Sequence, residues 1–178
     1  MEGFGEVSLF LAVKLRQRHF LTIMKQKSYT FSEIKQKIAN YCVYQDRSHQ
    51  EVEQKLKEFL LIPEAKEEIL LFLIAENYIN EERFTRSYIR GKFYIKSWGK
   101  KKIANQLKMK GITEKLIRKC MDEINEQDYK TKILEIYRDY YDKLPLAASY
   151  QKRSKTITYL IGKGYEYEDI LEMLDRKV

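Results

Sequence analysis

A segment of the chain recurs about fifty residues later. Residues 107–117 read Leu-Lys-Met-Lys-Gly-Ile-Thr-Glu-Lys-Leu-Ile, and they align at an offset of 53 with residues 160–170, Leu-Ile-Gly-Lys-Gly-Tyr-Glu-Tyr-Glu-Asp-Ile. A weaker match starts at Leu56, which lies 51 residues before Leu107. Repeats of this length indicate stacked supersecondary units, each of which covers the apolar face of its neighbour. The sequence therefore predicts three repeats of about fifty residues.

Helix-start and helix-stop signals divide each repeat into three helices. Thr30–Glu33 and Ser48–Glu51 have the capping-box pattern, and Pro63 suits a first helical position. Gly111 and Gly164 stand where a helix would end in the left-handed conformation that glycine adopts without strain. The chain contains only 7 Gly and 2 Pro, too few for a turn-rich β architecture. We therefore expect an all-α fold of three tandem three-helix repeats.

The expected repeats are residues 28–79, 80–126 and 127–178. Residues 1–27 match no repeat, and we expect a poorly ordered or extraneous extension there that the fold does not need. The apolar run Val7–Val13 is too short to span a membrane. Acidic residues precede this run and basic residues follow it, which is the wrong order for a secretory signal. We expect a cytoplasmic protein that does not contact membranes.

Positive charge is concentrated in the middle of the chain. Residues 83–119 hold thirteen Lys or Arg residues against one acid, Glu114, whereas the whole chain has a net charge of +8. Such an excess attracts polyanions or an acidic protein surface. Phe84, Tyr88 and Ile95 share one helical face and are expected in the core. The predicted contact residues are Arg83, Arg86, Arg90, Lys92, Lys96, Trp98, Lys100, Lys101, Lys102 and Lys108.

The sequence lacks the patterns of catalytic and metal-binding sites. Its two histidines, His19 and His49, have no neighbouring cluster of metal ligands, and we expect His49 to be solvated. There is no glycine-rich phosphate loop, and no nucleophile–histidine arrangement can be proposed. Cys42 and Cys120 lie in helix-like apolar patterns and are expected to be reduced, buried thiols. We expect no catalytic residue, no metal and no cofactor.

Residues 73–90 give the most specific signal in the chain. They read Leu-Ile-Ala-Glu-Asn-Tyr-Ile-Asn-Glu-Glu-Arg-Phe-Thr-Arg-Ser-Tyr-Ile-Arg, which closely resembles the signature of the RecX family of bacterial recombination regulators. The resemblance extends over about residues 30–176 and is most specific in the second repeat. The positions that match the signature are Tyr78, Ile79, Glu82, Arg83, Phe84, Arg86, Tyr88 and Arg90.

A second family pattern, Gly-x-x-x-Ile-x-x-x-Leu-x-x-x-Gly-Ile, is met between Gly99 and Ile112. Three positions depart from the family: Asn80 and Glu81 replace the usual aspartates, and Thr85 replaces an alanine. The first two changes keep a helix cap and a first-turn charge. Residues 91–97 are less basic than the family's arginine-rich counterpart, which would weaken a contact that the family makes there.

The resemblance implies both a shape and a role. Its members are all-helical, and their tandem three-helix repeats form an elongated, curved array. They bind RecA, are thought to lie in the groove of its DNA filament, and restrain its ATPase, strand-exchange and coprotease activities without chemistry of their own. The expected partners are thus RecA and the RecA–DNA filament. We also expect weak, sequence-independent nucleic-acid binding and a monomeric chain.

Two other functions fit parts of the sequence. The first is a helix-turn-helix-like DNA-binding protein that acts independently of RecA, because each repeat contains helix–turn–helix pairs. Its candidate recognition segment, residues 114–124, is poor in the Asn, Gln and Arg side chains that read base edges. The second is an inert helical scaffold, which leaves the basic segment unexplained.

For Glu82, near a helix start, we expect an ion pair within the fold, with Arg86 or Arg90 as partner.

Overall fold

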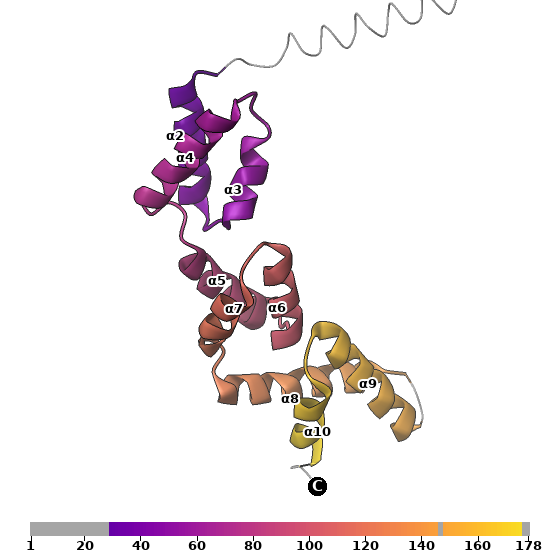
Figure 1. Cartoon of the computed structure of the whole chain (residues 1–178). Helices are drawn as coiled ribbons and strands as arrows, with labels where there is room; N and C mark the ends of the chain where they lie inside the picture. Colours follow the sequence, from indigo (N-terminus) through magenta and orange to yellow (C-terminus); the bar gives the residue numbers. More distant parts are fainter. Residues whose placement is uncertain (1–28, 146–147, 176–178) are drawn as a thin grey trace, which may run out of the picture. The chain divides into compact units, whose positions relative to one another are not determined.

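The computed structural model describes residues 29–145 and 148–175 (Figure 1). The expectations for residues 1–27, including the apolar run and His19, fall outside the described residues. The described residues belong to two units, which divide between Lys35 and Gln36. In the first unit, Thr30 and Glu33 form the expected capping box: the amide of Thr30 donates to Glu33 Oε2 at 2.8 Å, and the amide of Glu33 donates to Thr30 Oγ1 at 3.3 Å.

The described residues form α-helices and no strand, so the all-α prediction is confirmed. Three helices follow one another in each of three successive sets, as the internal repeat predicted. The helices are α2 (Phe31–Tyr44), α3 (His49–Leu56), α4 (Pro63–Ala75), α5 (Glu81–Arg90), α6 (Lys100–Met109), α7 (Glu114–Cys120), α8 (Glu126–Lys143), α9 (Ser149–Lys163) and α10 (Tyr167–Asp175). Figure 1 shows α9 and α10 packed beside α8, with α5, α6 and α7 grouped before them.

Local sequence signals set most helix ends. Ser48 and Glu51 form the second capping box, in which each backbone amide donates to the other's side chain. Asn80 Oδ1 accepts from the amide of Arg83 at 2.9 Å and so begins α5. Gly111 and Gly164 have φ angles of +81° and +92°, the left-handed conformation predicted for helix stops.

A π-helical turn, Gly91–Ile95, follows α5 and changes which residues are buried. The predicted core position Ile95 is wrong, because that side chain is 77% exposed. Each π turn contains one residue more than an α turn, so the side chains after it rotate by about 100° around the helix. Ile89 and Phe93 are completely buried instead. Phe84 is buried as expected, and Tyr88 packs partly buried against the core.

One apolar core runs through the second and third sets of helices. It contains Phe93, Tyr129 and Tyr165. The rings of Phe93 and Tyr129 stack with centroids 6.1 Å apart, and those of Tyr129 and Tyr165 lie tilted by 36° with centroids 5.3 Å apart. Cys120 also lies in this core, and its burial raises the pKa of the thiol. Cys42 and Cys120 are both free and buried, as predicted.

The start of α6 meets the end of α9 through two glycines. The amide of Gly99 donates to the carbonyl of Lys163 at 2.9 Å, and the amide of Lys101 donates to the carbonyl of Gly164 at 3.1 Å. The first free amides of one helix thus satisfy the last free carbonyls of another. A β-carbon on Gly99 would lie 2.2 Å from the carbonyl atoms of Gly164, so this contact requires glycine.

Candidate nucleic-acid and protein contact surface

Arg86 is the centre of an ion-pair network between α5 and the turn after α7. Its Nη1 lies 2.9 Å from both Asp122 Oδ1 and Glu123 Oε1, and its Nε donates to Glu82 Oε1 at 3.1 Å. Arg90 Nη1 donates to Glu123 Oε2 at 2.7 Å. These carboxylates raise the pKa of Arg86 above its ordinary value. The expected ion pair of Glu82 within the fold is therefore confirmed.

Arg83 is paired with a carboxylate from the segment between α2 and α3. Its Nε donates to Asp46 Oδ1 at 2.7 Å, and its Nη2 donates to the carbonyls of Asn77 and Tyr78 at 3.0 and 3.1 Å. The hydroxyl of Ser87 donates to Asp46 Oδ2 at 2.9 Å. Partial burial raises the pKa of Asp46, but the hydrogen bonds from Arg83 and Ser87 outweigh it, and the net pKa is lowered.

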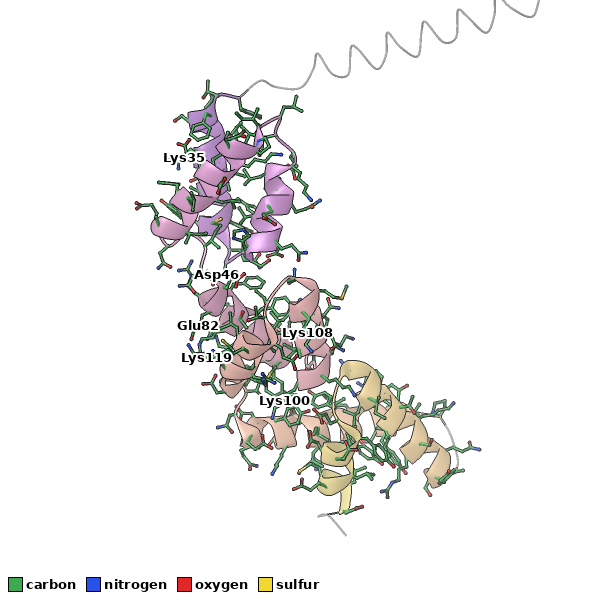
Figure 2. The ribbon with its side chains drawn as sticks, viewed as in Figure 1. Lys35, Asp46, Glu82, Lys100, Lys108 and Lys119 are labelled. Atoms are coloured by element: carbon green, nitrogen blue, oxygen red, sulfur yellow. The ribbon has the colours of Figure 1, made fainter. Side chains whose placement is uncertain are left out.

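These contacts form one charge-balanced group, here called the arginine cluster. Lys119 completes it, since its Nζ lies 2.6 Å from Glu82 Oε2 (Figure 2). Four cations thus face four carboxylates, so this part of the basic segment has no net charge to offer a polyanion. The members are Arg83, Arg86, Arg90, Lys119, Asp46, Glu82, Asp122 and Glu123.

The six predicted lysines lie elsewhere, on the π turn, on the connection after it and on α6; we call them the lysine face. Among the described residues only two of them contact carboxylates: Lys100 with Glu126 at 3.0 Å and Lys108 with Glu114 at 3.5 Å. An excess of four positive charges therefore remains. The face consists of Lys92, Lys96, Lys100, Lys101, Lys102 and Lys108.

Aromatic rings hold several of these ammonium groups. Lys92 Nζ and Lys102 Nζ lie 4.9 and 4.8 Å from the ring centroid of Trp98, and Lys92 is also 5.0 Å from that of Tyr88. Lys100 Nζ lies 4.3 Å over Tyr129. Such cation–π contacts attract a cation without neutralising it. Trp98 therefore both packs against the core and positions lysines whose charge stays available.

A groove beside the π turn was not anticipated from the sequence. It has a volume of about 470 Å³, and its lining includes Asp46, Tyr88, Lys92, Ile95 and Lys96. A β-carbon at Gly91 would meet no atom within 4 Å, so the glycine leaves this side of the helix open. The sequence feature that marks it is Gly91, a glycine within a helical pattern at the start of residues 91–97.

The residues that the structure describes contain neither a metal-binding cluster nor a membrane-spanning helix. Within residues 29–145 and 148–175, no group of three or more His, Cys, Asp or Glu side chains is placed to hold a metal ion. His49 Nε2 lies 3.4 Å from Glu53 Oε1 instead. None of the helices in these ranges has the length and apolar character needed to cross a bilayer.

Acid should weaken the arginine cluster. Hydrogen bonds from Lys119 and Arg86 lower the pKa of Glu82, and those from Arg90 and Arg86 lower the pKa of Glu123. Because the folded pKa lies below the unfolded value of about 4.3, the stabilisation is complete above that value and is lost as the pH falls through the folded pKa.

The melting temperature should therefore fall less between about pH 7 and about pH 3 in Glu123→Gln than in the unmodified chain, because the amide has no charge to lose. Thermal unfolding followed by circular dichroism measures both shifts. If the two proteins lose the same number of degrees, Glu123 does not stabilise the fold through its charge.

Comparisons with known proteins agree with this architecture. The family model described as the second three-helix domain of RecX matches residues 80–121. The crystal structure of RecX from Lactobacillus salivarius superposes with a TM-score of 0.74 and 24% identity, over 82% of this chain and 95% of that one. At this identity the superposition supports the fold alone.

Curated relatives extend the match along the chain. The regulatory protein RecX of Streptococcus agalactiae is 30% identical over 129 residues, which are 72% of this chain and 49% of that protein. The regulatory protein RecX of Finegoldia magna is 25% identical over 158 residues, or 84% of this chain and 72% of the relative. The chain thus spans about half the length of the streptococcal protein. Together with the signature at residues 73–90 and the three sets of three helices, these matches show that the chain belongs to the RecX family.

Proposed function

We propose that this chain is a non-enzymatic regulator that binds RecA and its DNA filament and restrains the recombinase, ATPase and coprotease activities. The relatives' name, regulatory protein RecX, supports the regulatory role. The observation that supports the lysine face as the contact surface is the distribution of charge in the basic segment. The arginine cluster is neutral, whereas the lysine face keeps uncompensated positive charge. We expect the chain to act as a monomer, in the cytoplasm where RecA works.

The lysine face suits a filament of protein and DNA. Ammonium groups contact phosphates as point charges and supply affinity without reading sequence. They would equally attract acidic side chains of RecA. Lys96 and Lys101 are exposed and form no ion pair with a described residue, so their contacts would require no existing pair to break.

The arginine cluster fits a different role. Arg86 would have to leave three carboxylates before it could contact a phosphate, and those carboxylates would repel the phosphate. We therefore propose that Arg83, Arg86 and Arg90 position α5 and that the lysines and Trp98 make the contacts. This narrows the set of ten contact residues predicted from the sequence.

The test uses RecA assembled on single-stranded DNA with ATP. Adding the chain should reduce ATP hydrolysis, and the chain should sediment with the filament more strongly than with the same DNA alone. Duplex DNA of random sequence should bind weakly. Tight, sequence-dependent duplex binding without an effect on RecA would favour the helix-turn-helix-like alternative. Absence of any RecA-dependent effect would reject the regulatory proposal.

A further inference from the structure

The first two helices of the third set are longer than those of the second. Helices α8 and α9 contain 18 and 15 residues, whereas α5 and α6 contain 10 each. Between residues 134 and 155 no described side chain is fully buried. Ile136 and Tyr137 pack against the core there, but both are only partly buried.

Stacked tyrosines contribute to the packing there. Tyr140 of α8 and Tyr159 of α9 lie with ring centroids 4.0 Å apart and ring planes only 6° from parallel. A second pair along α8, Tyr137 and Tyr141, has centroids 5.6 Å apart. Tyr159 keeps 37% of its surface exposed. The packing thus presents aromatic surface to solvent where α8 and α9 meet.

A hollow opens beside the Tyr140–Tyr159 pair. Its volume is about 330 Å³, and besides the two tyrosines its lining includes Lys143, Lys163 and Asp139. Lys163 Nζ lies 5.4 Å from the ring centroid of Tyr159. Neither lysine forms an ion pair with a described residue, so two cations face one carboxylate at the hollow.

Helix α9 adds further positive charge. It contains four basic residues and no Asp or Glu. Arg153 lies 3.7 Å from Asp175, and Lys152 Nζ lies 5.1 Å over the ring of Tyr141. Basic groups interleaved with exposed aromatic rings are the combination that single-strand binders use, because each base has a π-face to stack and each nucleotide a phosphate.

We infer that the hollow between α8 and α9 binds single-stranded nucleic acid, with a base stacked on the Tyr140–Tyr159 pair and phosphates beside Lys143 and Lys163. Duplex DNA does not fit this chemistry, since its bases are stacked on one another and do not expose their faces. The inference deepens the DNA-contact part of the proposed function and assigns it a second location, separate from the lysine face.

The test measures binding of a fluorescent thymidine oligonucleotide to the full chain by anisotropy, without RecA. Replacing both tyrosines by leucine, Tyr140→Leu and Tyr159→Leu, should weaken binding about tenfold, because base–aromatic stacking is lost. Replacing both by phenylalanine keeps the rings and should change affinity less than about twofold. Tyr44→Leu, which alters a tyrosine that is 87% exposed in α2, is the matched control and should have no effect.

Unchanged affinity in the folded leucine variant would overturn the inference, and so would an equal loss in the phenylalanine variant. If the leucine variant fails to fold, photo-crosslinking of the unmodified chain to an oligonucleotide with 5-iodouracil decides instead. Crosslinks on Tyr140 or Tyr159 support the site, and crosslinks confined to the lysine face reject it. RecA inhibition is measured separately, so a failure here leaves the regulatory proposal standing.

Discussion

Replacing Gly164 by valine should destabilise the chain far more than the same change at Gly111. Both glycines have positive φ, where a β-branched residue costs roughly 1–3 kcal/mol. At Gly111 the nearest atom to a new β-carbon is Gln50 Cβ at 3.7 Å, an ordinary contact. At Gly164 the β-carbon would lie 2.3 Å from Lys102 Cβ and 2.6 Å from Lys102 N. Backbone strain and overlap together should cost about 4 kcal/mol or more.

Gly99→Ala separates the two effects. Gly99 has an ordinary φ, so alanine meets no backbone strain there, but its β-carbon would lie 2.2 Å from the Gly164 carbonyl. We expect a loss of about 3 kcal/mol from overlap alone. Gly162→Ala is the control, because that β-carbon would meet nothing within 4 Å and alanine favours the helix.

Urea unfolding of the four variants measures these costs. Equal losses for Gly111→Val and Gly164→Val would show that the conformation of the two glycines, and not the contact between α6 and α9, explains their recurrence in the sequence. A stable Gly99→Ala protein would contradict the contact directly.

Reversing Lys100, Lys101 and Lys102 to glutamate should weaken binding to the RecA filament at least about tenfold, or roughly 1.4 kcal/mol. The three residues begin α6, where glutamate suits the helix dipole, so the fold should survive. The change reverses the charge of half of the lysine face. Affinity is measured by co-sedimentation with RecA on single-stranded DNA.

A second triple reversal, at Lys37, Lys57 and Lys66, makes the same change in net charge within α2–α4 and serves as the control. Affinity should fall much less in this variant. Equal losses in the two variants would indicate general electrostatic attraction, with no particular role for the lysine face.

Local signals in the sequence were sufficient for the helices. The capping boxes, Pro63, Gly111 and Gly164 act within one or two turns of chain, so their effect can be read without the fold. The exposed position of Ile95 could not be predicted in this way, since no local rule marks a π turn. The same holds for the approach of Gly99 to Gly164, which depends on how two repeats pack.

The charge distribution shows the same limit. A count over residues 83–119 gives one large basic segment, but the carboxylates that neutralise Arg83, Arg86 and Arg90 lie more than thirty residues away or outside that range. Only the fold brings Asp46 and Glu123 to these arginines. The aromatic and basic side of α8 and α9 could not be predicted from composition either, because residues 120–178 as a whole hold 10 basic and 12 acidic residues, whereas the four basic residues of α9 have no acid among them.

The salt dependence of filament binding tests the lysine face most directly. Each lysine–phosphate contact releases counterions, so the logarithm of the affinity should fall with the logarithm of the salt concentration, by about 0.7 per contact on single-stranded DNA. If Lys100, Lys101 and Lys102 make such contacts, the slope of the triple glutamate variant should be shallower than that of the unmodified chain by about two. Identical slopes, with both proteins folded, would contradict the assignment of the lysine face as the filament contact.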